Sequence, residues 1–471
     1  MNSQAFRPAR RSLLALGIAA GLVAAPLSAP LAATAATSID GAWQTDGYST
    51  IVAIDNGKAR VYVTAGMTCT PAEVAEQDGP AGPDGTVRFA APGLQAFTVR
   101  ATRDRAVQHT EGNVGDKHLR RLDKLPEACT LPGATGPLAT FDQFWTTYAE
   151  NYPFFQAKGI DWPAVRERYR PHVTPVMSDD ALFDLLAEMI KPLGDAHTAI
   201  RNERRGFYGS RPGTTLPDEA LEAKIRPYIE QTALKGVQFT SYANERIGYA
   251  DLPGRIGYLR VIAFLGYSST NGHYRADLNT LNQTLDKILT KQRTSGPDQL
   301  RGLIIDLRLN GGGSDQLALD LASRLTKQPF FAYFKRARND PQNPAAYTAP
   351  QPLFVRPSKS TPYTGPIALL TGGSQMSAGE TFTQAMMNRS PRPVRIGQTT
   401  QGVFSDVLIR TLPNGWQFIV PNEEFRTLGW QAFDGPGIPP DVRRPVFTPV
   451  ELAGHRDSAF TAALNLLRSG G

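Results

Sequence analysis

A serine in a glycine-rich turn is the strongest candidate nucleophile in the sequence. Ser377 lies in the segment Gly372–Glu380 (GGSQMSAGE), after a predicted strand at 366–370 and at the start of a helix predicted from about residue 378. Open α/β folds bind ligands at the carboxyl ends of their strands. A helix N-terminus also offers free N–H groups to a developing negative charge. A serine that only caps its helix would occupy the same position, so the pattern leaves both roles open.

A run of glycines after a second predicted strand, at 303–307, is the candidate oxyanion-binding segment. The strand continues into DLRLNGGG, in which Gly312 leaves bare backbone next to its neighbours. The N–H groups of Gly312 and Ala378 are the predicted oxyanion donors, and a tight turn without a ligand is the alternative. Four nearby polar residues are assigned supporting roles: Asp306, Arg308, Asn310 and Glu380. We expect the Glu380 charge to anchor the serine turn.

A histidine and an acid complete the predicted constellation. His197, in LGDAHT, is one of six histidines and would take the proton from Ser377 as a general base. Asp434, in FDGPGIPPD, would orient the imidazole, with Asp195, Glu380 and Asp441 as alternatives. A lone histidine is more often structural, and Asp-Gly pairs are common turn formers. The D-x-H fragment also resembles part of a metal site, but few convergent ligands accompany it.

Composition excludes several other classes of function. The chain has 471 residues, of which 41% are hydrophobic and 20% charged, as is usual for globular proteins. The formal charge of +7 is mild and dispersed, which argues against a nucleic-acid partner. Neither a Walker loop, G-x-G-x-x-G nor H-E-x-x-H occurs, and two cysteines are too few for a four-cysteine zinc site. We therefore expect no cofactor and no metal.

The N-terminus reads as a secretory signal peptide at residues 1–35. Three arginines precede an apolar stretch from Leu13 to about Leu31, and Ala33-Thr34-Ala35 fits the small-residue cleavage rule. A membrane anchor is the alternative, and the Arg10-Arg11 pair leaves general and twin-arginine export open. No later stretch has 18 consecutive apolar residues, so no membrane span is expected in the mature protein. The predicted location is periplasmic or secreted, where Cys69 and Cys129 could form a disulfide.

The rest of the chain divides into three predicted parts. Residues 36–135 are rich in short β-type runs separated by turns such as Asp55-Asn56-Gly57, which indicates an all-β sandwich or barrel. Residues 136–210 show aromatic and apolar residues at helical spacing, with helix starts predicted at Thr140, Asp161 and Ser178. Residues 211–471 alternate strands, glycine loops and helices in a βαβ-type pattern.

Four motifs, taken in order, resemble the C-terminal processing (tail-specific) serine peptidase family, in its tricorn-core and retinoid-binding-protein-like branch. They are L-G-D-x-H-T, D-L-R-x-N-x-G-G, S-A-x-E and D-G-x-G-I-x-P-D, and they lie within about 140–448. The resemblance implies an α/β core of the crotonase/ClpP-like β-α superhelical type with an N-terminal helical cap. It also implies that Ser377 is the nucleophile, His197 the base and Asp434 the acid.

The sequence departs from the family in three respects. Processing enzymes with a Ser–Lys dyad carry the lysine about 25 residues after the serine, but no lysine follows Lys359 here, which favours His197 as the base. Tricorn-like enzymes place a serine before the histidine, where this chain has Ala196. Fewer than 60 residues separate the His197 motif, which ends at Thr198, from the strand at Ile256, and this is too short for the PDZ domain of the family. Cleavage of peptides or short segments is therefore expected rather than processive reading of tails.

The sequence thus predicts an exported serine-type peptidase that acts on a peptide or protein substrate through Ser377, His197 and Asp434. Two alternatives remain open at this stage. One is a non-catalytic protein that binds apolar ligands on the same fold, as the retinoid-binding repeats imply. The other is an esterase or amidase acting on small molecules.

Overall fold

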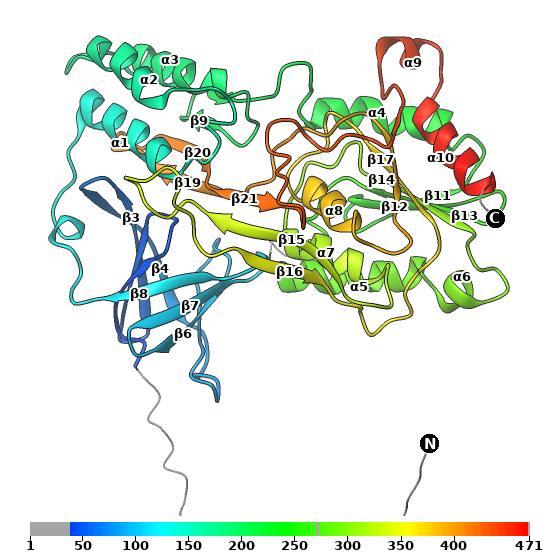
Figure 1. Ribbon diagram of the computed structural model, residues 1–471, viewed down its shortest axis with the longest axis horizontal. Coiled ribbons are helices and arrows are strands. Elements are labelled where there is room, and N and C mark those ends of the chain that lie inside the picture. The colour runs from blue at the N-terminus through cyan, green and yellow to red at the C-terminus, as the bar shows by residue number, and fades with distance from the viewer. Residues whose placement is uncertain (1–37, 270–272, 470–471) are drawn as a thin grey trace, which may run out of the picture. The chain divides into compact units, whose positions relative to one another are not determined.

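The computed structural model describes residues 38–269 and 273–469. The predicted signal peptide at 1–35 lies outside the described residues. The order of the elements along the chain is shown in Figure 1.

The N-terminal region is a closed barrel of eight antiparallel strands, which settles the choice between sandwich and barrel. Its strands are β1 (Gly41–Thr45), β2 (Thr50–Asp55), β3 (Lys58–Ala65), β4 (Thr68–Gln77), β5 (Val87–Ala90), β6 (Phe97–Thr102), β7 (Arg105–Thr110) and β8 (Lys117–Leu122). Alternating residues fill the interior, among them the fully buried Trp43, Phe89 and Leu119. A Cys69–Cys129 disulfide joins β4 to the segment that leaves the barrel.

Three helices follow: α1 (Gly136–Asn151), α2 (Trp162–Tyr169) and α3 (Asp179–Ile190). The predicted caps of α2 and α3 are confirmed, since Asp161 and Ser178 accept N–H groups from Ala164 and Ala181. The predicted start of α1 at Thr140 is wrong. The helix begins one turn earlier, with a proline in its first turn, a position where a missing N–H costs nothing.

The helices pack on a sheet of order β10-β9-β20-β19. Its strands are β9 (Ala199–Arg201), β10 (Gly206–Tyr208), β19 (Val407–Thr411) and β20 (Gln417–Pro421). Phe144 and Tyr148 of α1 contact Phe418 of β20, with ring centroids 5.1 and 6.1 Å apart. Packing therefore crosses the predicted boundary at residue 210, because a segment two hundred residues later completes the core of the helical part.

The central sheet has seven strands in the order β11-β12-β13-β14-β17-β18-β22. They are β11 (Phe239–Tyr242), β12 (Ile247–Leu252), β13 (Ile256–Val261), β14 (Gly302–Asp306), β17 (Ile367–Thr371), β18 (Val394–Gly397) and β22 (Val442–Arg443). The strands from β13 to β22 are parallel. The carboxyl ends of β14 and β17, which precede the glycine loop and the serine turn, therefore lie side by side.

Helices cover both faces of this sheet (Figure 1). One face packs against α5 (Tyr274–Ile288), α7 (Asp315–Ser323) and α8 (Ala378–Met386), and the other against α4 (Glu219–Thr232) and α10 (Ser458–Ser469). The helix predicted at 274–292 divides into α5 and a short α6 (Lys291–Ser295), and α9 (Pro449–Ala453) precedes α10. Residues 209–255 were predicted to be too few for a PDZ domain. They form α4, β11 and β12.

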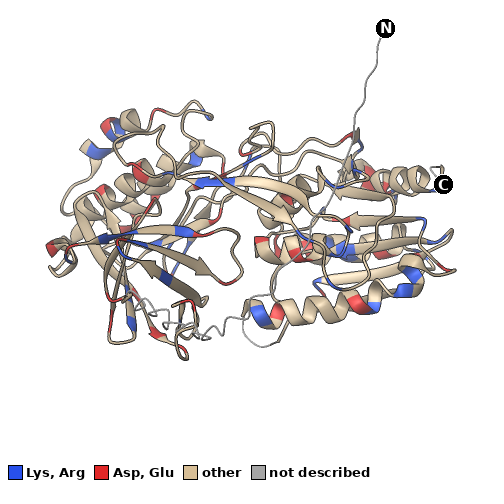
Figure 2. Cartoon of the chain, turned by 60° about the horizontal axis from the view of Figure 1, so that its bottom comes forward, with Lys and Arg blue, Asp and Glu red and all other residues tan. Residues whose placement is uncertain are grey.

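A third sheet, β16-β15-β21, consists of β15 (Phe330–Ala337), β16 (Gln351–Val355) and β21 (Glu423–Arg426). Lysine, arginine and acidic residues are interspersed over the strands and helices rather than gathered on one element (Figure 2). Within the described ranges, no helix combines the length and apolar character needed to cross a membrane.

Candidate active site

Ser377 occupies the N-cap position of α8 but does not act as a cap. Its backbone has φ +54° and ψ −128°, a conformation that side chains rarely adopt, and its hydroxyl makes no capping hydrogen bond to the helix. Strain of this kind costs on the order of 1–3 kcal/mol and persists only where surrounding contacts enforce it. The backbone thus holds the hydroxyl away from the helix end, where it is available for other chemistry.

Gly312 approaches the serine closely enough to require glycine. A Cβ built on Gly312 would lie 2.4 Å from Ser377 Cβ, 2.9 Å from its Oγ and 3.3 Å from the nitrogen of Ala378. The strand ends thus bring together the three residues predicted to form the nucleophile and oxyanion hole. The Ala378 N–H belongs to the first turn of α8, and in the described part of the chain it has no hydrogen-bond partner.

The Gly312 N–H differs from the expectation, because it already donates to Asn310 Oδ1 at 2.9 Å. The side-chain amide of Asn310 also donates to the Val261 carbonyl at 3.0 Å. The backbone carbonyl of Asn310 accepts the Met376 N–H. This residue therefore ties the glycine loop to the serine turn. A substrate oxyanion would have to share the Gly312 N–H with Asn310.

Asp306 and Arg308 lie behind the glycine loop. Arg308 donates to both oxygens of Asp306, at 2.9 and 2.7 Å, and to Asp457 at 2.8 Å. Tyr258 adds a hydrogen bond to Asp306, and all four groups are fully buried. Both oxygens of Asp306 are paired within this buried network, so Asp306 and Arg308 fix the end of β14 rather than meet a substrate.

Three consecutive residues of one loop, Val403 to Ser405, each lie next to one of the three predicted catalytic residues. We refer to Thr400–Asp406 as the 400–406 loop. Val403 O accepts the Ser377 N–H at 2.9 Å, and the Phe404 N–H donates to Asp434 Oδ1 at 3.1 Å. The Ser405 backbone lies next to the His197 imidazole, and this contact raises the pKa of the imidazole. The nucleophile, the acid and the base thus converge on one loop from three separate regions of the chain.

The His197 imidazole is enclosed and incompletely partnered. Burial lowers its pKa from the usual value, and the charge of Asp195 and the Ser405 backbone oppose that effect. Its Nδ1 is buried with no hydrogen-bond partner, and within the described residues no hydrogen bond joins the ring to Ser377 or to Asp434. A neutral imidazole at neutral pH is the state that a general base requires.

Asp434 presents a second orphaned atom. Its Oδ2 is buried without a partner, whereas Oδ1 accepts the Phe404 N–H. Burial raises the pKa of Asp434 well above the usual range, with further contributions from the charges of Asp195 and Glu380. Unpaired buried polar atoms are rare in native proteins and call for an explanation. One imidazole nitrogen and one carboxylate oxygen are both left unsatisfied here.

Two of the alternative acids, Asp195 and Asp441, make other hydrogen bonds. Asp195 accepts the backbone N–H of His197 at 2.9 Å on one oxygen and the Tyr152 hydroxyl at 2.8 Å on the other. Asp441 binds the Arg395 guanidinium and backbone N–H, at 2.8 and 2.9 Å. Asp195 therefore shapes the turn that carries His197, and Asp441 holds the end of the sheet.

Glu380 and Arg211 clamp the 400–406 loop. The Glu380 carboxylate accepts the N–H groups of Gly402 and Val403 at 2.7 and 2.8 Å, and burial raises the pKa of this group to about 8. Arg211 donates to the carbonyls of Thr400 and Gln401 at 2.5 and 2.9 Å. Glu380 thus acts on the serine turn through the loop that receives the Ser377 N–H.

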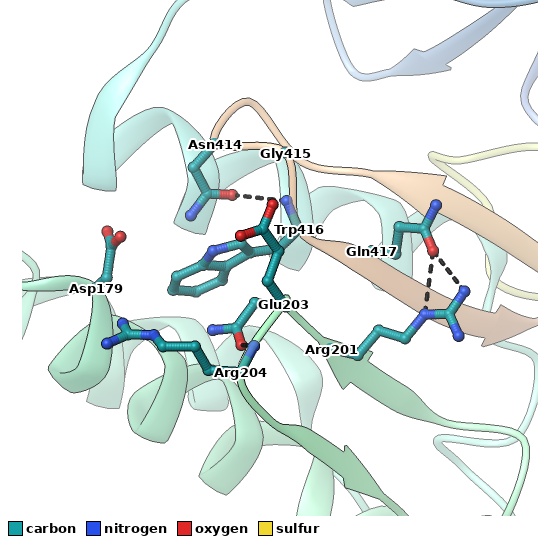
Figure 3. A pocket seen from close by; sticks show the side chains of 9 residues that line it. Asp179, Arg201, Glu203, Arg204, Asn414, Gly415, Trp416 and Gln417 are labelled. Atoms are coloured by element: carbon teal, nitrogen blue, oxygen red, sulfur yellow. Dashed lines mark hydrogen bonds between the residues drawn. The ribbon is translucent and has the colours of Figure 1, made fainter.

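A polar pocket of about 530 Å³ lies near the segment that follows His197, and Figure 3 shows the side chains that line it. Arg201 donates twice to Gln417 Oε1, and Asn414 accepts the Trp416 backbone N–H. None of the predicted catalytic residues lines this pocket. The part of the chain that the structure describes holds no group of three or more potential metal ligands.

Sequence reasoning missed the loop that organises the site. The resemblance drew attention to residues 400–404 only because a lysine is absent there. Arg211 and the hydrogen-bonding role of the loop carry no local signature, since both act through backbone groups that any sequence could supply. The position of the loop, about 25 residues after Ser377, was the one available signal.

Two of the following three solved structures share this fold, and the third has a lower structural similarity. A protein from Parabacteroides merdae, described as a peptidase, is 24% identical with a TM-score of 0.59, covering 72% of this chain and 98% of that chain. Mature CPAF is 12% identical with a TM-score of 0.50, covering 71% and 96% respectively. The photosystem II D1 C-terminal processing protease is 18% identical with a TM-score of 0.42, covering 66% and 94%. No curated protein sequence matches the chain at a significant level.

Two sequence families match the chain itself. Residues 255–444, which contain the glycine loop, the serine turn and the 400–406 loop, match Peptidase family S41. Residues 138–191, which form α1 to α3, match the Tricorn protease C1 domain. These matches identify a serine-peptidase region of family S41 at residues 255–444 and a region similar to the tricorn C1 domain at residues 138–191.

Proposed function

We propose that this protein is an exported peptidase that hydrolyses peptide bonds through Ser377, His197 and Asp434. The convergence of the three residues on Val403, Phe404 and Ser405 is the observation that carries the proposal. We further propose that the central sheet and its helices form a core of the crotonase/ClpP-like superhelical type with a helical cap.

In the proposed mechanism, Ser377 Oγ attacks the carbonyl carbon of the scissile bond while the His197 imidazole accepts the hydroxyl proton. The C–N bond then breaks, and the imidazolium returns its proton to the leaving amine. Water deprotonated by His197 attacks the acyl ester, and the serine and a carboxylic acid are released. The Asp434 carboxylate stabilises the imidazolium and fixes the tautomer.

The unpaired atoms suit a link between the acid and the base. His197 Nδ1 and Asp434 Oδ2 both lack a hydrogen-bond partner, and Ala196 stands where tricorn-like enzymes carry a serine. We propose that the carboxylate acts on the imidazole through a small rotation or one bridging water, which would satisfy both atoms.

The oxyanion is assigned to the N–H groups of Ala378 and Gly312. Ala378 offers a free donor at the positive end of α8, and Gly312 would share its hydrogen with Asn310. Loss of one oxyanion donor typically raises the barrier by roughly 3–4 kcal/mol.

The proposed substrates are peptides or short protein segments, because the chain between His197 and Ile256 builds the central sheet instead of a tail-binding domain. Export follows from the predicted signal peptide, and the Cys69–Cys129 disulfide suits an oxidising compartment. The non-catalytic alternative is not favoured, since a strained serine with a non-capping hydroxyl has no role in passive ligand binding.

A digest of a defined peptide library tests the proposal. The mature protein and its Ser377→Ala variant are incubated with the library, and new termini are identified by mass spectrometry. We expect cleavages by the wild type and none by the variant. Equal cleavage by both proteins would contradict the assignment of Ser377. Turnover of p-nitrophenyl esters without any peptide cleavage would identify an esterase instead.

A further inference from the structure

One turn of the N-terminal barrel reaches both halves of the active site. The turn between β7 and β8, residues 111–116, lies at the end of the barrel. Asn113 donates its side-chain amide to Asp406 Oδ2 at 3.1 Å, and Asp406 ends the 400–406 loop. The neighbouring Gly112 O accepts the Ser314 hydroxyl at 2.5 Å. Ser314 directly follows the glycine loop and caps α7, so the turn contacts the chain next to both site segments.

The charges of Glu423, Lys335 and Lys117 act on Asp406, which accepts the Asn113 amide. Lys335 of β15 binds Glu423 of β21 at 3.1 Å, with both side chains at most 4% exposed. Tyr48 of the barrel donates its hydroxyl to the same carboxylate at 2.7 Å. Lys117, at the start of β8, stands 4.5 Å from the centre of the Tyr48 ring. Tyr48 therefore joins the barrel to the catalytic part through a buried hydrogen bond to a buried ion pair.

The contact continues from Asp406 to the base. Ser405 precedes Asp406, and its hydroxyl accepts the N–H groups of Asn422 and Glu423 at 3.0 and 2.9 Å. The backbone of the same Ser405 lies against the His197 imidazole. A displacement of Asp406 would therefore be transmitted to the backbone beside the general base within one residue.

We propose that the β7–β8 turn is a positioning element of the active site, in which Asn113 holds the 400–406 loop through Asp406. This inference rests on the proposed function, because it assigns a role to the barrel in serine chemistry. Displacements of about 1 Å in a catalytic group can lower rates by about 100-fold. Asn113 is accordingly a positioning residue, which touches neither the substrate nor the reacting atoms.

The same turn provides a matched control contact. Gln351 of β16 accepts the Asp116 N–H at 2.8 Å and donates to the Asp116 carbonyl at 2.6 Å. These bonds also join the barrel to the catalytic part, but they do not involve the 400–406 loop. The Gln351→Ala variant thus weakens barrel docking by a comparable number of hydrogen bonds without releasing Asp406.

The test is the kinetics with which a fluorophosphonate probe labels Ser377, resolved into kinact and KI. The variants are Asn113→Ala, Asp406→Ala, their double mutant, Asp406→Asn and Gln351→Ala. We expect each alanine variant at 113 and 406 to lower kinact by about tenfold or more with little change in KI. The double mutant should be no slower than Asp406→Ala alone, because the two residues act through one contact. Asp406→Asn keeps an acceptor oxygen and should be closer to the wild type.

Several outcomes would overturn the inference. A wild-type rate for Asn113→Ala, an equal loss for Gln351→Ala, or independent losses that multiply in the double mutant would each do so. A lower labelled fraction at an unchanged rate would show unfolding instead of misplacement, and would also count against it. Failure of the wild-type protein to label at Ser377 would contradict the proposed function itself.

Discussion

Phe404 donates its backbone N–H to Asp434 Oδ1 at 3.1 Å, while the other oxygen of this buried carboxylate has no partner. The hydrogen bond fixes the acid relative to the loop that also receives the Ser377 N–H. The second oxygen, Oδ2, is left without a partner and can therefore act on the imidazole. One oxygen of Asp434 thus has a structural role and the other the proposed electrostatic role.

Replacement of Asp434 by asparagine should separate its structural role from its electrostatic role. The Asp434→Asn variant keeps an oxygen for the Phe404 N–H but loses the charge that stabilises the imidazolium. We expect turnover to fall by at least about 100-fold, measured as the rate of peptide cleavage. The matched Asp441→Asn variant, whose carboxylate pairs with Arg395 instead, should retain turnover within a few-fold. The reverse ranking of the two variants would transfer the acid role to Asp441.

The pH dependence should respond to Asp195 in a known direction. The charge of Asp195 raises the pKa of both His197 and Asp434, and the active form requires both groups to be unprotonated. Loss of this charge lowers both pKa values, so the acid limb of the pH–rate profile should move to lower pH in Asp195→Asn. The measurement is the labelling rate between pH 4 and 8. The exposed Asp180→Asn change is the control, and a shift to higher pH would refute the electrostatic account.

Gly312→Ala should damage the site by crowding, in addition to the backbone strain that its φ of +92° imposes on any side chain. The added methyl group would lie 2.4 Å from Ser377 Cβ, so the serine turn must shift. Gly136 provides the comparison, because its φ of +88° is close to the +92° of Gly312 and nothing lies within 4 Å of its built Cβ. We expect peptide cleavage by Gly312→Ala to fall by about 100-fold or more, and that by Gly136→Ala to be retained. Equal activities would show that the space beside Ser377 is not critical.

The disulfide should stabilise the barrel without contributing to chemistry. Cys69 and Cys129 are separated by 60 residues, and their cluster includes Ile51 but no residue of the 400–406 loop. Replacement of both cysteines by serine should lower the free energy of unfolding by about 2–4 kcal/mol. The labelling rate of the folded protein should be unchanged at low temperature. A slower rate at full labelling would instead link the disulfide to the active site.

The fold of the catalytic part followed from local patterns. The buried strands at 303–307 and 366–370, each followed by glycines and a helix, predicted that Gly312 and Ser377 follow strand ends. The parallel pairing of β14 with β17 in the structure makes those ends neighbours. The order of the four motifs then indicated the family, because motif order can be read from a sequence without knowledge of its tertiary contacts.

The remaining features depend on long-range contacts that no local pattern encodes. Residues 407–421 look like an ordinary hairpin, but they complete the core of the helical part because Phe418 fits between Phe144 and Tyr148. The bond from Gly312 to Asn310 was missed for a similar reason. A side-chain oxygen competes with the substrate for that N–H, and its rotamer depends on the neighbouring Val261.

The central claim is that His197 activates Ser377, and the rate of fluorophosphonate labelling of the wild type and His197→Ala tests it most directly. The account predicts a single labelled residue, Ser377, and a loss of about 1000-fold or more in rate when the imidazole is removed. Labelling of Ser377 at the same rate in His197→Ala would contradict the claim, because the hydroxyl would then be activated by another group.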